Sequence, residues 1–276
     1  MKTEKIGFIG TGNMGTALLT GASKACGPEQ FIFFDTDAAK RDAINDSLGI
    51  EAADDTADVA AKAKYLFLMV KPQSYEEVLG QIRSELRPDH ILISVAPGVT
   101  AGWIYRVCGQ DQADERERFR VVRVMPNTPA LLGAGMTGYS YADGSLSKEE
   151  GALIGQIFAT CGKAKRVEES LMDAVICASG SSPAFYYLVI DAIAKRCEQL
   201  GMSREDAVLF AAQASLGSAR MVLETGEDPA VLAERVCSKG GTTIEGVRSL
   251  QKDDLDAVMA RAVDATYRRA VEMRKE

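Results

Sequence analysis

The stretch KIGFIGTGNMG, residues 5–15, decides how the rest of the chain is interpreted. It begins as a short apolar run typical of a buried β-strand, and residues 13–26 then show the apolar spacing of a helix. Between them lies a G-x-G-x-x-G pattern, whose glycines permit a tight turn, close approach of a pyrophosphate and close packing of helix on strand. The helix N-terminus adds amide donors and a positive dipole. The stretch therefore predicts that a nicotinamide dinucleotide is bound by Gly10, Thr11, Gly12, Asn13, Met14 and Gly15.

A second apolar run, residues 30–35, ends on an acidic residue 20 positions after Gly15, as a dinucleotide fingerprint requires. Asp35 is expected to accept hydrogen bonds from the adenosine ribose, which favours NADH because a 2′-phosphate would meet a negative charge. Thr36, Lys40 and Arg41 could instead contact a phosphate, so the choice between NADH and NADPH stays open.

Apolar strands and helical segments continue to alternate up to about residue 167. Strands are expected at 5–10, 30–35, 65–70, 90–95, 120–125, 136–141 and 163–167, and helices at 13–26, 38–48, 74–86, 100–107 and 147–161. Strands that are apolar throughout and separated by helices indicate a parallel sheet covered on both faces. The pattern predicts a doubly wound α/β domain.

The remaining residues are expected to be all-helical, with a domain boundary near residue 168. Helices are predicted at 169–177, 183–200, 203–225, 229–236, 243–250 and 253–275, with Ser203 and Asp253 as N-caps and Gly201 and Gly226 as stops. Small residues on several helix faces would allow close packing, either within the chain or in an intertwined dimer.

Composition excludes several classes of protein. The 276 residues include 32 Lys and Arg against 39 Asp and Glu, a net charge of −7 that gives nucleic acid no basic surface. The longest apolar runs are much shorter than the roughly 20 residues that span a bilayer, and no leader is evident, so no membrane span and a cytoplasmic location are expected. The six cysteines form no CxxC. A single histidine, His90, excludes a Cys/His zinc cluster, and no metal is expected.

Three further turns follow predicted parallel strands. Because ligands of open α/β sheets bind at the carboxyl ends of the strands, these turns are expected to line the cofactor crevice. Their candidate cofactor-binding residues are Val70, Lys71 and Pro72, then Ala96 and Pro97, then Met125, Pro126 and Asn127.

The helical region holds two loops rich in small residues. Residues 179–183, SGSSP, are expected to break one helix and start the next. Residues 237–243, CSKGGTT, precede another helix, and the amides of the Gly-Gly turn, two Thr hydroxyls and the helix N-terminus would suit a small carboxylate.

Taken together, FIGTGNMG, VKPQ, APGVT, RVVRVMPNTPALLGAGMTG, ASGSSPAF and SKGGTTIEGV resemble the pyrroline-5-carboxylate reductase family in order and spacing over essentially the whole chain. The resemblance implies a Rossmann domain, 1–168, followed by a helical dimerisation and substrate-binding domain, 169–276. It also implies a homodimer, commonly assembled into a ring of dimers. The implied reaction is reduction of L-1-pyrroline-5-carboxylate to L-proline with NADPH or NADH.

By the same resemblance, the substrate carboxylate is held by Ser238, Gly240, Gly241, Thr242 and Thr243. Thr243 is expected to hydrogen-bond the ring nitrogen as the catalytic residue, and Glu169 and Ser181 to contact the ligand. The chain departs from the family pattern where Ser182 replaces a Gly, Lys239 a Pro and Arg235 an Asn. Many members prefer NADPH, whereas Asp35 favours NADH.

Two other functions are compatible with a dinucleotide fingerprint. A β-hydroxyacid dehydrogenase would place a catalytic lysine a few residues beyond a Gly-rich turn, but after Gly180 no lysine occurs before Lys195. A dinucleotide-binding sensor without turnover would keep the glycine fingerprint and would not need the GGTT loop. Substrate turnover separates the sensor from either enzyme.

Overall fold

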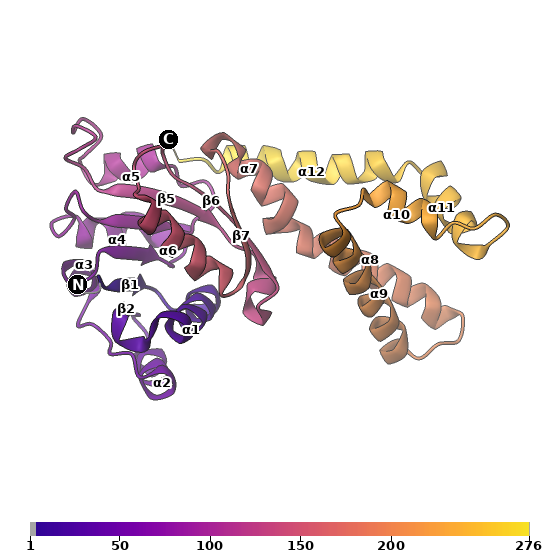
Figure 1. Ribbon diagram of the computed structural model, residues 1–276, viewed down its shortest axis with the longest axis horizontal. Coiled ribbons are helices and arrows are strands. Elements are labelled where there is room, and N and C mark those ends of the chain that lie inside the picture. Colours follow the sequence, from indigo (N-terminus) through magenta and orange to yellow (C-terminus); the bar gives the residue numbers. More distant parts are fainter. Residues whose placement is uncertain (1–3, 276) are drawn as a thin grey trace. The chain divides into compact units, whose positions relative to one another are not determined.

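A seven-stranded sheet in the order β2-β1-β3-β4-β5-β6-β7 forms the centre of the N-terminal part of the chain (Figure 1). The structure is a computed structural model that describes residues 4–275. The strands are β1 (Ile6–Ile9), β2 (Phe31–Phe34), β3 (Tyr65–Leu68), β4 (Ile91–Ser94), β5 (Arg120–Met125), β6 (Gly135–Ser140) and β7 (Gly162–Arg166). The first five pair in parallel, which confirms the doubly wound α/β prediction.

The last two strands reverse direction. β6 pairs antiparallel with β5, and β7 pairs parallel with β6. A parallel connection needs a crossover of a dozen or more residues, but only a short segment with one 3₁₀ turn, η3 (Thr128–Leu132), joins β5 to β6. The parallel prediction therefore holds for most of the sheet and fails at this edge.

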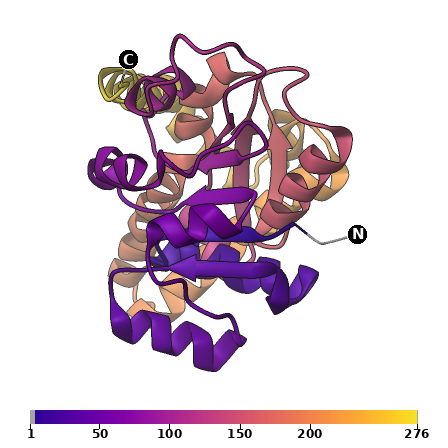
Figure 2. The same ribbon diagram turned by 90° about the vertical axis from the view of Figure 1, so that its left-hand side faces the viewer.

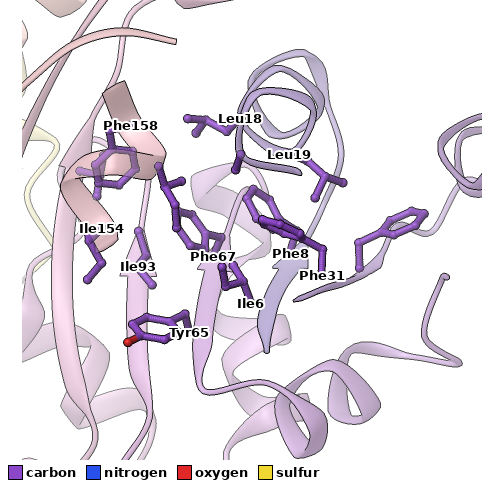
Figure 3. Packing of buried hydrophobic residues seen from close by; sticks show 14 of the residues in the cluster. Ile6, Phe8, Leu18, Leu19, Phe31, Tyr65, Phe67, Ile93, Ile154 and Phe158 are labelled. Atoms are coloured by element: carbon purple, nitrogen blue, oxygen red, sulfur yellow. The ribbon is translucent and has the colours of Figure 1, made fainter. Parts of the chain in front are cut away.

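Helices cover both faces of the sheet (Figure 2). The core on one face contains side chains from α1 (Asn13–Cys26), α2 (Ala38–Leu48) and α6 (Lys148–Ala159). Figure 3 shows Phe8 of β1 beside Phe67 of β3, stacked with ring centroids 4.5 Å apart, and Phe158 of α6 meets Phe67 edge-on. The core on the other face contains side chains from α3 (Thr56–Lys62), α4 (Tyr75–Ile82) and α5 (Ala101–Val107). The sequence prediction missed α3, which Asp55 caps by accepting a hydrogen bond from the Asp58 amide at 2.8 Å.

After β7 the regular elements are helical. They are η4 (Glu169–Leu171), α7 (Met172–Val175), a π-helical turn (Ile176–Ser181), α8 (Ser182–Gln199), α9 (Arg204–Thr225), α10 (Pro229–Arg235), α11 (Thr242–Lys252) and α12 (Leu255–Glu272). Ser203 caps α9 as predicted, and Gly226 ends it at φ +68. The prediction of Asp253 as an N-cap is wrong: Asp253 is the C-cap of α11, and the Asp254 carboxylate accepts from the Ala257 amide at 3.3 Å in α12.

The predicted break at 179–183 is also wrong, because α7, the π-helical turn and α8 run on without a loop. Pro183 has no N–H, so the Ser179 carbonyl lacks the donor that an α-helix would supply four residues on. The Asn127 side-chain amide donates to this carbonyl at 3.0 Å instead. The chain therefore continues through the small residues with a π-type turn, a feature often found at functional sites.

By compactness the chain forms two units, Met1–Ser181 with Thr266–Glu276, and Ser182–Ala265. The change to helical structure follows β7, next to the proposed domain boundary at 168. Within residues 4–275, one continuous helical stretch, Glu169–Gln199, has the length and composition to cross a membrane, with 11% of its most apolar window buried. The expectation of no membrane span was based on the short apolar runs. It did not include this continuous helix, because a break was expected at 179–183.

Candidate active site

The three fingerprint glycines occupy three different environments. Gly10, at φ +91, has no room for a side chain, since a Cβ would lie 2.9 Å from Val70 Cγ1 and 3.1 Å from the Met69 carbonyl carbon. A Cβ on Gly15 would lie 2.6 Å from the Gly10 carbonyl oxygen, so helix α1 packs directly on the turn. A Cβ on Gly12 would meet no described atom within 4 Å. The turn, the close packing and the open approach thus match the roles expected of Gly10, Gly15 and Gly12.

The first turn of α1 is suited to an anion. Gly12 is its N-cap, and in the described chain no side chain caps this end. Thr11, Gly12 and Asn13 line a cavity of about 840 Å³ together with Lys40. Uncapped amides, the positive end of the helix dipole and a lysine ammonium are what a pyrophosphate needs. Met14 points elsewhere and packs against the hydrophobic core.

Asp35 lies at the end of β2 and holds the fingerprint turn. Its Oδ2 accepts from the Thr11 amide at 2.6 Å and the Thr11 hydroxyl at 2.9 Å, and its Oδ1 accepts from the Asp37 amide at 3.0 Å. Burial tends to raise the pKa of Asp35, but these hydrogen bonds and nearby Lys40 outweigh it, so the pKa is lowered. The carboxylate is therefore ionised at neutral pH.

A second cavity, of about 610 Å³, adjoins Asp35 on the other side of the turn. Its lining includes Gly10, Thr36 and Val70, and three carboxylates from Asp35, Asp55 and Glu77. Arg41 lies nearby but donates to the Asp35 carbonyl at 2.6 Å and stacks over the Phe34 ring. The cavity has the position expected for an adenosine, with acidic walls.

Tyr75 joins the turns that follow β3 and β4, and no sequence pattern indicates this role. Its buried hydroxyl donates to the Leu68 carbonyl at 2.9 Å and accepts from the Val95 amide at 2.9 Å. Lys71 precedes the 3₁₀ turn Pro72–Ser74, and Ala96 is buried with Pro97 beside it. The predicted residues of both turns are thus held at adjacent strand ends.

The turn after β5 is held from inside the protein. Asn127 is buried; besides donating to Ser179, its side-chain oxygen accepts from the Met136 amide at 2.9 Å. Met125, which precedes Pro126, packs with Met172 and Ile176. These contacts give Met125 and Asn127 structural roles alongside the predicted cofactor contact.

Glu169 is paired with an arginine that the sequence did not single out. The buried Arg123 of β5 donates to Glu169 Oε1 at 3.0 Å. Both residues line a small cavity of about 200 Å³ that also contains Thr100 and Asp173. Ser181, at the end of the π-helical turn, is half-buried.

The GGTT loop leads into α11 in the unit 182–265. Gly240, at φ +75, makes the turn, and the Gly241 amide donates to the Ser238 carbonyl at 3.0 Å. Thr242 and Thr243 form the exposed first turn of α11, which has no side-chain cap in the described structure. The structure thus brings together the five residues expected to hold a carboxylate. Of the departures, Arg235 pairs with Glu227, and Lys239 is exposed.

The remaining titratable candidates show no catalytic arrangement. His90 is buried, and burial and then Arg87 lower its pKa, so its ring is neutral; its Nδ1 accepts from the Arg87 amide at 2.8 Å. Within residues 4–275 no group of three or more His, Cys, Asp or Glu side chains could hold a metal ion.

The fold and the uncapped, glycine-lined turn define a Rossmann-type oxidoreductase that uses a nicotinamide dinucleotide. Residues 169–273 match the family model described as pyrroline-5-carboxylate reductase dimerisation, and residues 5–98 match that described as NADP oxidoreductase, coenzyme F420-dependent. The chain is 40% identical to the pyrroline-5-carboxylate reductase of Escherichia coli (strain K12), with 99% of each chain covered, and 37% identical to that of Methanosarcina acetivorans, with 100% of each covered. The chain belongs to the pyrroline-5-carboxylate reductase family.

Solved structures agree with this assignment. A pyrroline-5-carboxylate reductase from Coxiella burnetii superimposes with a TM-score of 0.91 at 31% identity, and both chains are fully covered. The Plasmodium falciparum pyrroline carboxylate reductase, solved with NADP bound, superimposes with a TM-score of 0.83 at 27% identity, again over both full chains. A Rossmann domain followed by a helical dimerisation domain is thus confirmed.

Proposed function

We propose that this chain reduces the cyclic imine L-1-pyrroline-5-carboxylate to L-proline, the last step of proline biosynthesis, with NADH or NADPH. When bound, the nicotinamide supplies a hydride to the imine carbon, and the ring nitrogen retains or gains one proton, so that C=N becomes CH–NH. A protonated imine is already electrophilic, so the protein chiefly has to orient it and stabilise its carboxylate. The lack of a catalytic histidine is compatible with this chemistry.

The observation that carries the proposal is the occurrence of two glycine-capped helix N-termini without a side-chain cap, each suited to an anion. α1 presents an uncapped turn with the dinucleotide glycines, and α11 presents an uncapped turn with GGTT. A sensor that only binds dinucleotide would need the first and not the second. The second supports a small carboxylic acid as substrate.

At α11, we assign the substrate carboxylate to the amides and hydroxyls of Ser238, Gly240, Gly241 and Thr242. Thr243 follows on the same exposed turn, and we assign its hydroxyl to the ring nitrogen. The assignment of Glu169 and Ser181 to the ligand rests on the family pattern. We further propose the domain division at 168, a homodimer that assembles into a ring of dimers, and a cytoplasmic location.

The test is the initial rate of nicotinamide oxidation when purified protein meets L-1-pyrroline-5-carboxylate, run in parallel with NADH and NADPH. Turnover with formation of proline is expected with at least one cofactor. A 3-hydroxy acid with NAD⁺ and NADP⁺ serves as the control for a β-hydroxyacid dehydrogenase and is expected to give no rate. Dinucleotide binding without imine turnover would favour the sensor and reject the proposal.

A further inference from the structure

The last described residues of the chain lie against the turn that follows β4. The Lys275 amide donates to the Gly98 carbonyl at 2.7 Å, and Lys275 forms an isolated parallel β-bridge with Val99. The Thr100 hydroxyl donates to the Lys275 carbonyl at 2.9 Å and also caps α5 by accepting from the Trp103 amide at 3.1 Å. Met273–Lys275 therefore adds a short strand-like segment to this turn, and is called the C-terminal strap below.

The turn is shaped to admit the strap. Gly98 has φ +74, and a Cβ there would lie 2.3 Å from the Met273 carbonyl oxygen and 2.8 Å from its carbon. Such distances are far inside van der Waals contact, so no other residue type fits without moving the strap. Glycine is therefore required at position 98 of the APGVT motif because the strap passes too close for a side chain.

Lys275 contacts one turn with its backbone and a second turn with its side chain. Lys275 Nζ lies 4.5 Å from the centre of the Trp103 ring and donates to the Pro72 carbonyl at 3.4 Å. Pro72 follows β3 and Gly98 follows β4, and these strands are neighbours in the sheet. Lys275 therefore links the two strand-end turns that are expected to line the cofactor crevice.

The strap is anchored to a buried charge. Arg274 Nε and Nη2 donate to Asp173 Oδ2 at 2.7 and 2.5 Å, and the Asp173 side chain is 3% exposed. A buried carboxylate requires a charged or hydrogen-bonded partner, so this pair holds the strap in one position. α12 begins in the unit 182–265 and ends in the other unit, directly before the strap.

We propose that the C-terminal strap is a positioning element that holds the turns after β3 and β4 in the conformation that binds the dinucleotide cofactor. It contributes no catalytic group. Loops that are ordered before binding lose less entropy when the ligand binds, so the strap raises dinucleotide affinity. The inference deepens the proposed function and rests on it for what the bound dinucleotide does.

The test compares a chain that ends at Glu272 with Lys275→Ala, Arg274→Ala and Arg274→Lys. The dissociation constants of NADH and NADPH are measured from nicotinamide fluorescence, and kcat and both KM values from steady-state rates.

We expect the truncation and Arg274→Ala to raise the cofactor Kd about tenfold and Lys275→Ala about threefold, because preorganisation is lost. In the truncated chain and in Lys275→Ala, the KM for the imine should rise less than the cofactor Kd, since most of the contacts assigned to that ligand lie at α11. Arg274→Lys, which keeps the charge, should recover part of the affinity. Arg269→Ala is the matched control, because Arg269 pairs with Glu272 on the exposed end of α12.

An unchanged cofactor Kd in a folded truncated chain would overturn the proposal. An equal rise in cofactor Kd and imine KM would also overturn it, because it indicates general loss of structure. If the truncated chain does not fold, Lys275→Ala decides, with circular dichroism as the check on folding. The cofactor Kd can be measured without turnover. If the wild-type chain binds NADH but does not reduce the imine, the proposed function is rejected, and the variants still decide whether the strap raises dinucleotide affinity.

Discussion

Asp35 acts on the chain's own backbone as well as facing the expected adenosine site. Its oxygens hold the Thr11 amide and hydroxyl, and its lowered pKa keeps it negatively charged. Asp55 and Glu77 line the same cavity. Three carboxylates disfavour a 2′-phosphate, so the lining of this cavity favours NADH over NADPH.

Replacing Asp35 with serine is expected to shift cofactor choice. Asp35→Ser removes the charge closest to the expected ribose, so the ratio of kcat/KM for NADPH to that for NADH should rise about tenfold, the size of one modest electrostatic contact. Thr11→Val is the control, because it breaks a hydrogen bond to the same carboxylate and keeps its charge. A ratio that stays constant in Asp35→Ser would reject the role of Asp35 in cofactor choice.

A second prediction concerns the hydroxyl of Thr243. Removing its hydroxyl in Thr243→Ala should lower kcat/KM for L-1-pyrroline-5-carboxylate about 10- to 100-fold, while the Kd of the dinucleotide changes less than about twofold. Thr243→Ser keeps the hydroxyl and should retain most of the activity. Steady-state kinetics with fluorescence titration separate the two effects, and unchanged kinetics in Thr243→Ala would end the assignment.

Some of these residues could be predicted from the sequence and others could not. Gly10, Gly15 and Asp35 act on neighbours a few residues or one strand away, so fixed spacing reveals them. Asn127 fills a hydrogen-bonding gap created by Pro183, and Arg123 pairs with Glu169 across the fold. Such partners depend on tertiary structure, and local patterns do not reveal them.

Helices and strands also divide into those that local sequence patterns predict and those that they do not. Long periodic helices and apolar strands were predicted with nearly the observed bounds. The short helix α3 was missed because seven residues give little periodicity. The π-helical turn was mistaken for a break because Gly and Pro usually interrupt helices, and here a distant side chain compensates for the missing N–H.

At the start of helix α6, the buried Glu150 is the centre of a charge cluster. Its carboxylate accepts from Arg120 Nη1 at 2.8 and 3.0 Å and pairs with Lys64 at 3.0 Å. It also completes a capping box with Ser147. Burial raises the pKa of Glu150, but the Ser147 amide, Lys64 and Arg120 outweigh this and lower it.

Glu150→Gln should therefore lower the free energy of unfolding by about 3 kcal/mol at pH 7, as expected when a buried ion pair is broken. This is the lower end of the usual range, because glutamine can still form the capping box with Ser147. Because the folded pKa of Glu150 lies below its ordinary value of 4.5, its contribution is complete above that pH and is lost as pH falls through the folded pKa. The difference between wild type and variant should shrink below about pH 4.5.

Urea unfolding at fixed protein concentration, at pH 7 and pH 3.5, measures this difference. Glu149→Gln is the control, because Glu149 lies on the same turn, is exposed and pairs with neither Arg120 nor Lys64 in the described contacts. A Glu150→Gln destabilisation that is equal at both pH values would contradict the electrostatic explanation.

At the scale of the whole molecule, the helical region exposes far more apolar surface than the sheet region. In the described residues 4–168, the large apolar side chains that stand out are Leu131 and Leu132. The helices of the unit 182–265 expose many more, among them Tyr186, Tyr187, Leu188, Leu209, Phe210, Leu216 and Leu223. Faces of this size on a water-exposed helix normally contact something else.

The stretch Glu169–Gln199 has enough length and apolar character for a membrane span, but a second copy of the chain explains the same surface. Residues 169–273 match a dimerisation family model. Charged residues such as Asp191 and Lys195 lie within α8 and pair with each other at 2.7 Å. An apolar helix with charged positions suits a protein interface better than lipid, where each such charge is costly.

Leu209→Asp tests whether the exposed apolar face of α9 forms the interface between two copies of the chain. Leu209 of α9 is 62% exposed in the single chain, and two aspartates buried in a symmetric dimer should weaken association by about 3 kcal/mol or more, which is at least about a hundredfold in Kd. Leu132→Asp is the matched control, because Leu132 is 89% exposed but lies outside the residues that match the dimerisation model. Light scattering coupled to size exclusion, run over a dilution series, should show Leu209→Asp dissociating at a concentration at least about a hundredfold higher than wild type, and an unchanged oligomer for Leu132→Asp. An unchanged mass for Leu209→Asp would exclude this face of α9 from the interface.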